Sequence, residues 1–411
     1  MKWIRRIAVY AVFFALLASI PRVLSLPSSP PDGLAAHKYE GYTGVLKLWV
    51  CEDWSGGALC AWLNRCLTAF EKAHKGVYVQ LTQVSRGTMA RYASAQVIPP
   101  DALIFSPGML DGAQGLARLK TDAALRDSLS RMGRTEDGLY ALPVALGGYG
   151  FAVNRSLLGS LPNDWSAVEL PARKNAPAVM NVPADDEAHS WSAALIALLS
   201  GTYAGENGAP PRAGEGLDFG LPTATPAAQA TEPPPLLENA LPRALPNDFR
   251  TLPGVYAAFT KGQAAAIPVT QREIHRLALL ADQGKAPDYL VAASGEAFTD
   301  QAALFAINDA ERPDRQARVE LCRVLLEQLL SDEMQQKLTI ARAFRTTDGA
   351  PLYPAQSEMG ILEAHLSQPD LLAAPAFSNS WRQEARALCD RMQAGELTPR
   401  EAMSTLKERL S

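Results

Sequence analysis

Residues 138–158, GLYALPVALGGYGFAVNRSLL, contain two apolar extended runs that meet at Gly147 and Gly148. The stretch has no turn chemistry long enough for a hairpin, so one strand is expected to run directly into the next. Gly147, Gly148 and Gly150 accept backbone angles that other residues avoid, so the chain could bend here. A single strand carrying a bulge would use glycine equally well. The stretch therefore predicts either a bulged strand or a hinge crossing between two lobes.

The size of the chain predicts two lobes. With 411 residues, 47% of them hydrophobic and 20% charged, it is longer than a single hydrophobic core usually supports. The net charge of -4 is spread without a basic block, which excludes the phosphate-neutralising surface that nucleic-acid binding needs. We expect a globular protein of two lobes that does not bind nucleic acid.

The first 26 residues predict export. A basic start precedes an apolar run at 7–20, followed by Pro21 and small residues, as in a secretory signal peptide. The run is short for a membrane span, which needs about 20 residues, but the cleavage site is only fair, so an uncleaved signal anchor is the alternative. Residues 27–41 are a Pro-rich linker. The protein is expected outside the cytoplasmic membrane, in a periplasm or at the cell surface, touching the membrane only through its N-terminal segment.

Cysteine use leaves more than one interpretation open in an oxidising compartment. A disulfide from Cys51 to Cys60 or Cys66 is one alternative, and the odd total of five leaves at least one thiol. A zinc site lacks the usual CxxC or HxxxH spacing. Buried thiols, including Cys322 and Cys389, are the interpretation that we favour.

The order of elements predicts an α/β fold. A strand at 44–50, a helix at 58–74 and a strand at 77–84 form a parallel pair with a helical crossover. The first lobe continues with a helix near 88–96, a strand at 101–105 and helices through Leu119 and Met132.

The pattern restarts after the glycine-rich stretch, which predicts a second α/β lobe. Its elements are a strand at 176–182, a helix at 189–200, a helix before Lys261, a strand at 264–269 and a helix from Gln271. Residues 201–249 are rich in Pro, Gly, Ala and Thr and are expected to be a disordered insertion.

A helical C-terminal region closes the chain. Strand-like runs at 288–295 and 301–308 precede helices expected at 315–330, 332–343, 357–372, 377–394 and 399–410. The last helix has the clearest start, because Thr398 and Glu401 match a capping box around Pro399.

Six motifs stand in one order along the chain: GVLKLWVCEDW, FEKAHKGVYVQL, PDALIF, DGLYALPVALGGYGFAVNRSLL, AAFTKGQAAAI and SDEMQQKL. In this order they resemble the family 1 extracellular solute-binding proteins of ABC importers, the group that includes maltodextrin-binding protein. The resemblance implies a two-lobed periplasmic-binding-protein type II fold with hinge strands. Lobe 1 would comprise residues 42–147 and 287–346, and lobe 2 residues 148–286 and 347–411.

Ligands of open α/β sheets bind beyond the carboxyl ends of the strands, which nominates the residues that follow them. The expected ligand-binding residues are Asp53, Trp54, Ser106, Tyr149, His189, Trp191, Thr270, Gln271 and Trp381. By resemblance, Asp53 would be an acidic ligand contact and Trp381 a stacking aromatic. Tryptophan rings stack on the apolar faces of sugars, although a tryptophan buried in a core is the plainer alternative.

Three positions depart from the family pattern. Maltodextrin binders carry an aromatic residue where this chain has Ser106, an acidic residue where it has Gly147, and a tryptophan near Thr270 and Gln271. Several sugar contacts are therefore missing. This leaves a smaller sugar, another polar solute, or a pocket no longer used for transport.

The sequence does not predict an enzyme, a cofactor or a metal site. The only compact titratable cluster, at 185–187 with His189, is explained by acids that favour a helix N-terminus. No GxSxG, HExxH or glycine-rich phosphate loop is present. We expect a monomer that captures a small polar solute, a sugar by preference, through hinge closure and delivers it to ABC permease subunits. The alternative is a membrane-anchored sensor that presents a ligand, or binds a protein, at a receptor.

Overall fold

The computed structural model describes residues 42–91, 99–120, 125–158, 178–180, 189, 192–196, 252–293, 297–377, 381–394 and 396–410. All of them belong to one compact unit, Glu40–Ser411. The predicted signal segment, linker and insertion lie outside the described residues, as do Trp191 and the acids at 185–187. The predictions made for those segments therefore remain predictions.

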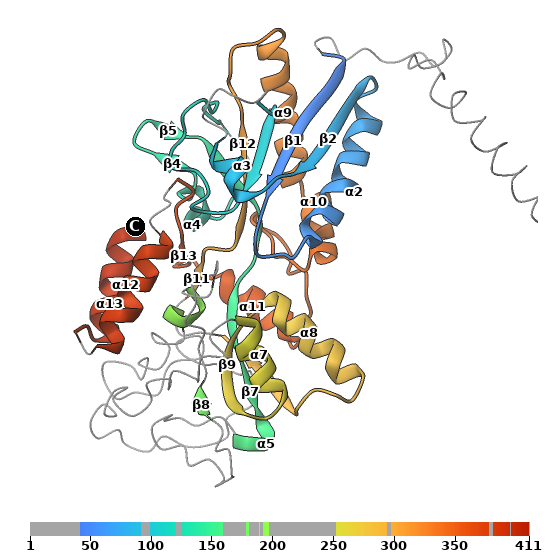
Figure 1. Ribbon diagram of the computed structural model, residues 1–411. Helices are drawn as coiled ribbons and strands as arrows, with labels where there is room; N and C mark the ends of the chain where they lie inside the picture. The colour runs from blue at the N-terminus through green and yellow to red at the C-terminus, as the bar shows by residue number, and fades with distance from the viewer. Residues whose placement is uncertain are drawn as a thin grey trace, which may run out of the picture. The chain divides into compact units, whose positions relative to one another are not determined.

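The first sheet has five described strands in the order β2-β1-β3-β12-β6. They are β2 (Val77–Gln83), β1 (Gly44–Cys51), β3 (Ala102–Phe105), β12 (Ala302–Ile307) and β6 (Ala141–Leu146). β1 runs parallel to β2 and β3, as the strand-helix-strand pattern predicts. β12 lies antiparallel between β3 and β6, so a strand from the C-terminal half completes a sheet of N-terminal strands (Figure 1).

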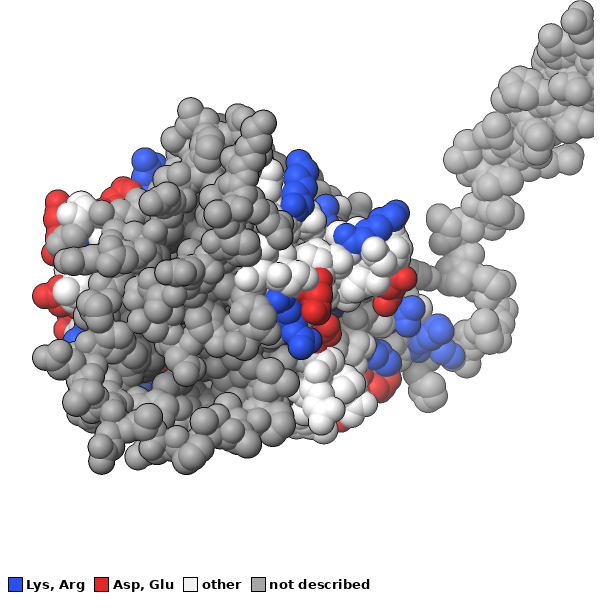
Figure 2. Space-filling view, turned by 90° about the horizontal axis from the view of Figure 1, so that it is seen from below, with Lys and Arg blue, Asp and Glu red and all other residues white. Residues whose placement is uncertain are grey.

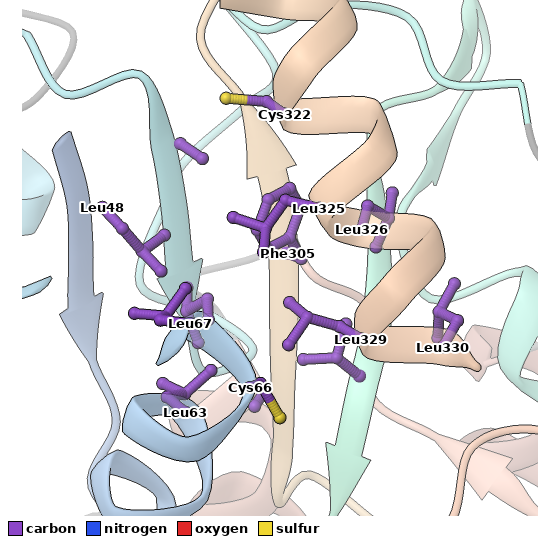
Figure 3. Close-up of a cluster of buried hydrophobic side chains, with 14 of the residues drawn as sticks. Leu48, Leu63, Cys66, Leu67, Phe305, Cys322, Leu325, Leu326, Leu329 and Leu330 are labelled. Atoms are coloured by element: carbon purple, nitrogen blue, oxygen red, sulfur yellow. The ribbon is translucent and has the colours of Figure 1, made fainter. Parts of the chain in front are cut away.

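Two helices cover the core of this sheet. α2 (Ala58–Ala73) buries one stripe of side chains at helical spacing: Leu59, Trp62, Leu63, Cys66, Leu67 and Phe70. α9 (Arg315–Leu330) presents leucines to Phe305 of β12, as Figure 3 shows. Both helices are confirmed where the hydrophobic spacing predicts them.

The helix expected through Leu119 is wrong. The amide of Leu119 donates to the carbonyl of Leu139 at 2.7 Å, and that of Ala117 donates to Ile307 at 2.8 Å. These long-range backbone hydrogen bonds take the place of helical ones, so residues 117–119 run beside the strands instead of forming a helix. The described helices nearby are short: α3 (Arg86–Ala90) and α4 (Asp127–Ser130), next to the hairpin of β4 (Arg134–Thr135) and β5 (Gly138–Leu139).

The second sheet has four described strands in the order β10-β7-β9-β8. They are β10 (Tyr289–Ala292), β7 (Tyr149–Asn154), β9 (Ala264–Thr270) and β8 (Ala178–Met180). α5 (Arg155–Leu158), α7 (Leu252–Thr260) and α8 (Gln271–Asp282) adjoin this sheet. β10 pairs with β7 and therefore belongs to the second sheet. The sequence predicts that lobe 1 resumes at residue 287, so this boundary has to move to a position after β10.

The C-terminal helices follow the predicted order with shorter bounds. α10 (Asp332–Gln336) continues as a 3-10 helix (Lys337–Ala341), and α11 spans Glu358–Leu366. The predicted helix at 332–343 stops early because Arg342 adopts a left-handed φ of 54°. β11 (Phe298–Thr299) pairs with β13 (Leu372–Ala373).

α12 (Trp381–Gln393) and α13 (Pro399–Leu410) lie side by side, with α13 next to β13 (Figure 1), and their apolar residues belong to the same buried cluster as those of β7. The start predicted for α13 is confirmed. Thr398 Oγ1 accepts from the amide of Glu401, and the Glu401 carboxylate accepts from the amide of Thr398 at 2.8 Å. Two backbone donors are thereby satisfied at the helix N-terminus.

The chain does cross from one sheet to the other at Gly147 and Gly148, because β6 belongs to the first sheet and β7 to the second. The reason for glycine differs from the expected one. None of Gly147, Gly148 and Gly150 has a positive φ. A Cβ on Gly147 would instead lie 2.5 Å from both Gln271 Nε2 and Gln301 Oε1. Close packing therefore demands glycine here, while hinge motion itself remains a prediction.

The five cysteines all lie in the described residues, and none forms a disulfide. Figure 3 places Cys66 and Cys322 at opposite ends of the first core. Burial raises the pKa of the Cys51 thiol to about 11, with Asp53 adding to the effect. Buried thiols, the favoured interpretation, are what the structure shows for four of the five cysteines, whereas Cys60 is partly exposed. Among the described helices, none combines the length and apolar character that a membrane crossing requires.

Candidate functional site

The candidate site surrounds the crossing between the two sheets. Thr299 Oγ1 donates to the carbonyl of Gly147 at 2.8 Å, and the amide of Gly147 donates to the carbonyl of Gln301 at 2.6 Å. Gln271 Oε1 accepts from the amide of Gly148 at 3.0 Å. The crossing is thus fixed by the segment before β12 and by the first residue of α8, which brings parts of both sheets to one place.

His189 joins two carboxylates at this place. Its Nε2 lies 2.9 Å from Asp53 Oδ1, and its Nδ1 lies 3.1 Å from Asp300 Oδ1. Only 10% of the His189 side chain is exposed. The residue has a φ of 66°, a left-handed conformation that side chains other than glycine adopt rarely. The surroundings hold His189 in this strained conformation, which is common at functional positions.

Asp300 is the centre of a larger hydrogen-bond network. Besides His189, its carboxylate accepts from the Tyr149 hydroxyl and from Ser192 Oγ, each at 2.5 Å. Tyr149 comes from β7 and Ser192 from residues that pack in the same core as β7. The carboxylate is buried, with 7% of its side chain exposed. Its partners therefore replace the water that a buried charge would otherwise lose.

These contacts shift the pKa values of the three groups toward the charged forms. Burial lowers the pKa of His189, but Asp300 and Asp53 outweigh it and raise the pKa to about 10. Burial raises the pKa of Asp53, but His189 first, then Ser106 and Arg86, lower it to about 2. The pKa of Asp300 is likewise lowered, because His189 outweighs burial. At neutral pH the three residues are an imidazolium between two carboxylates.

Arg86 supplies a second cation near Asp53. Its Nη1 lies 3.7 Å from Asp53 Oδ2, and its Nη2 donates to the carbonyl of Gly108 at 3.1 Å. Ser85 Oγ caps the short helix α3 that carries Arg86 by accepting from the amide of Thr88. The two cations and two carboxylates make the charged part of the site electrically balanced.

The uncharged part of the site is unsatisfied. Trp54 Nε1, Gln271 Nε2 and Gln301 Oε1 have no hydrogen-bond partner among the residues that the structure describes, and their residues are only 3%, 2% and 1% exposed. The Ser106 hydroxyl makes no hydrogen bond of good geometry with the described residues, but it lies close enough to Asp53 to lower the pKa of that carboxyl. Buried polar atoms nearly always have partners. Around Gly147, two hydrogen-bond donors and one acceptor are therefore left for a ligand to satisfy.

The structure separates the predicted site residues into groups. Asp53, Ser106, Tyr149, His189 and Gln271 come together with Trp54. Trp54 is buried, and its ring lies 2.9 Å from the point that a Cβ on Gly147 would occupy. It therefore offers no exposed face for stacking. The alternative of a buried tryptophan is the one that the structure shows.

The other predicted residues fare differently. Thr270 caps α8 and forms a capping box with Glu273, which gives it a structural role. Trp381 is the first residue of α12. Trp191 lies outside the described residues, so its predicted contact stays a prediction.

Sequence reasoning missed Thr299, Asp300, Gln301, Ser192 and Arg86. The first three form a short polar run from Thr299, the last residue of β11, to the start of β12. That interruption was a usable signal, because polar residues at a strand end commonly face a site.

The site does not favour catalysis or metal binding. Both ring nitrogens of His189 face carboxylates, so neither is free to take a proton from a nucleophile. Within the described ranges, no group of three or more His, Cys, Asp or Glu is arranged to hold a metal ion.

Comparison with known proteins identifies the fold. No protein-family model matches the chain, and no curated protein matches it. Solved structures match it closely in architecture at low identity, and the fold is that of two-lobed periplasmic binding proteins.

Three of these structures illustrate the range. The chain is similar to the GacH receptor of Streptomyces glaucescens, solved with and without acarbose, with a TM-score of 0.55, 15% identity and coverage of 90% and 97% of the two chains. A cyclic alpha-maltosyl-1,6-maltose binding protein from Arthrobacter globiformis gives a TM-score of 0.59, 13% identity and coverage of 90% and 98%. A Trichodesmium protein in complex with iron and citrate gives a TM-score of 0.52, 14% identity and coverage of 85% and 99%.

Proposed function

We propose that this protein is an extracytoplasmic solute-binding protein that captures a small, uncharged, hydroxyl-bearing solute, a sugar, between its two lobes. The observation that carries the proposal is the set of unpartnered atoms around Gly147. Trp54 Nε1 and Gln271 Nε2 donate hydrogen bonds, and Gln301 Oε1 accepts one. A hydroxyl group both donates and accepts, so adjacent sugar hydroxyls match this set.

The charged groups point to the same class of solute. Asp53 and Asp300 are already matched by His189 and Arg86. A charged solute would add a charge for which this balanced set offers no partner, and an unpaired charge is costly in a buried site. Figure 2 shows Lys and Arg interspersed with Asp and Glu on the described part of one face. Such mixed charge does not steer nucleic acid, in keeping with a small-molecule ligand.

The similar structures support a binding role rather than an enzymatic one. One of them was solved with acarbose, one is a cyclic alpha-maltosyl-1,6-maltose binding protein, and one was solved with iron and citrate. We extend the sugar to this chain because the unpartnered atoms are uncharged. Delivery to ABC permease subunits and a monomeric state belong to the same proposal, as do the lobe bounds once β10 is assigned to lobe 2. The sensor alternative would use the same capture step.

A thermal-shift screen of the purified protein tests the proposal. A solute that binds only the folded state stabilises it by about 2.7 kcal/mol at a concentration 100 times its Kd. Mono- and oligosaccharides are the expected hits. Amino acids, polyamines, and ferric citrate are the controls. A shift with charged solutes alone would reject the sugar, and no shift with any of them would reject solute capture.

A matched pair of tryptophan variants then locates the site. Trp54→Phe removes the unpartnered Nε1 and keeps an aromatic, though smaller, ring, so we expect the Kd of the hit to rise about fivefold to tenfold, the equivalent of about 1 kcal/mol. Trp62→Phe is the control, because Trp62 Nε1 donates to the carbonyl of Met334 at 2.8 Å inside the first core. That variant should lose stability with an unchanged Kd. Equal Kd values for Trp54→Phe and the wild type would place the solute elsewhere.

A further inference from the structure

His189 connects parts of the molecule that belong to different sheets. Asp53 follows β1 of the first sheet. Residues 193–196, which follow closely on His189, pack in the core that contains β7 of the second sheet, and the amide of Ala193 donates to the carbonyl of His189 at 2.8 Å. The contact between His189 and Asp53 therefore joins one lobe to the other.

Asp300 has a different part in this arrangement. Its carboxylate binds His189, Tyr149 and Ser192, and two of these come from the side of the second sheet. Asp300 therefore anchors the imidazole in place. Asp53, with 27% of its side chain exposed and, among the described residues, only Arg86 as a further ion partner, is the more easily released of the two carboxylates.

We propose that Asp53, His189 and Asp300 form an ion-pair latch that holds the two lobes closed in the absence of solute. The inference deepens the proposed function, since it names what regulates the same site. His189 is a positioning residue in this scheme: it sets the balance between open and closed forms without itself being required to touch the solute. The strained φ of 66° at His189 is the conformational cost of holding the ring between the carboxylates.

The latch has a defined pH range. The pKa of His189 is about 10 in the folded protein, above its ordinary value of about 6.5, so its contribution is complete below pH about 6.5 and is lost as the pH rises through 10. The pKa of Asp53 is about 2, below its ordinary value of about 3.9, so its contribution is lost as the pH falls through 2.

Other ionisable groups around the latch do not interfere in this range. Burial, and then Asp300, raise the pKa of Tyr149 well above its ordinary value, and burial, then Asp53, raise that of Cys51 to about 11. Arg86 is a further charged neighbour of Asp53, at 3.7 Å. The closed form is thus expected to persist at neutral pH and to open above pH about 10.

Small-angle scattering of the full chain without solute measures the latch directly. Asp53→Asn and His189→Gly should each increase the radius of gyration relative to the wild type. Asp309→Asn is the matched control, because Asp309 pairs with Arg315 at 2.7 Å, next to the first sheet. Raising the pH from 9 to 11 should expand the wild type and leave Asp53→Asn unchanged.

Chemical rescue gives a second readout. His189→Gly leaves a space between two carboxylates, and glycine accepts the left-handed backbone. Imidazole at pH 6, where it is a cation, should restore the compact form of His189→Gly and raise its Tm, whereas imidazole at pH 9 should not. His275→Ala, which removes a half-buried histidine of α8, controls for unspecific effects of imidazole.

The outcomes separate the latch from the solute site. Wild-type scattering for Asp53→Asn and His189→Gly, with no response to imidazole, would overturn the latch and leave the sugar proposal intact. If His189→Gly does not fold, Asp53→Asn alone decides. A latch that behaves as expected beside a silent solute screen would keep the switch and reject the sugar.

Discussion

Two buried aspartates in this protein have opposite surroundings. The Asp101 carboxylate, 1% exposed, lies 2.9 Å from Arg318 Nη1 and 3.0 Å from Arg312 Nη2, and it accepts from the amide of Lys47 at 2.7 Å. All of these partners adjoin the first sheet. The Asp300 carboxylate is held by a histidine, a tyrosine and a serine at the crossing between the sheets.

The difference lies in what the partners can do. A guanidinium keeps its charge at every pH at which proteins fold, so the Asp101 cluster can only hold its lobe together. An imidazolium can release its proton, so the bond between His189 and Asp300 can be switched. Burial alone therefore does not separate a structural carboxylate from a functional one, whereas the chemistry and location of its partner do.

Asp101→Asn should have the largest effect. It leaves two guanidinium groups without their carboxylate, so we expect the free energy of unfolding to fall by about 3–5 kcal/mol. Urea unfolding measures the loss, and solute affinity should remain at the wild-type value. A loss smaller than that of Asp300→Asn would contradict the contrast between the two sites.

Asp300→Asn should cost about 2–3 kcal/mol, because Tyr149, Ser192 and His189 lose a charged acceptor. The loss is smaller than at Asp101 since His189 can shed its proton or keep Asp53 as its partner. The decline of wild-type stability between pH 6.5 and 10 should also flatten in this variant. Asp309→Asn, an exposed control, should keep the wild-type pH profile; an unchanged slope in Asp300→Asn would count against the network.

Gly147→Ala should cost about 1–2 kcal/mol, because the new methyl group would meet the side-chain amides of Gln271 and Gln301 at 2.5 Å. Thermal unfolding and the solute Kd should both worsen, since these amides belong to the site. Gly87→Ala is the control, because its nearest neighbour is Arg91 Nη2 at 3.9 Å. Comparable losses in the two variants would show that close packing at the crossing is not the reason for glycine.

Thr398→Ala should have the smallest effect on stability, because Thr398 contacts neither the Asp101 cluster nor the Asp300 network. Losing the cap of α13 should cost about 0.5–1 kcal/mol in urea unfolding. Thr405→Ala, inside the same helix, should change little, because alanine is the better helix former. A loss above that of Gly147→Ala would mean that the C-terminal helices contribute more to stability than the crossing does.

Much of the fold was predictable because local patterns specify it. α9 and α13 lie where hydrophobic spacing and the Thr398 capping box predict them. The crossing at Gly147 followed from two apolar runs without a loop. The helix predicted through Leu119 was wrong, because the amide of Leu119 donates to the carbonyl of Leu139 in a strand instead of to a helical carbonyl. Local sequence patterns do not show which backbone groups will form hydrogen bonds with a strand that is distant in the sequence.

The site was less predictable than the fold. Asp53 and His189 were named from their positions after a strand and before a helix, but Asp300 lies 111 residues from His189 and carries no motif. Trp54 was expected as a stacking surface and is buried instead. Partners that meet only through the order of strands in a sheet require the three-dimensional structure.

The position of β12 has a consequence for how the chain acquires its structure. β12 supplies the hydrogen-bond partner on one side of β3 and on one side of β6, and it ends at Ile307 of a chain of 411 residues. During synthesis those two strands keep open edges until most of the polypeptide has been made. Open edges are sites of aggregation, and pairing over such distances is slow. A fragment that ends before Ala302 should therefore not fold by itself, and the two sheets should unfold in a single transition.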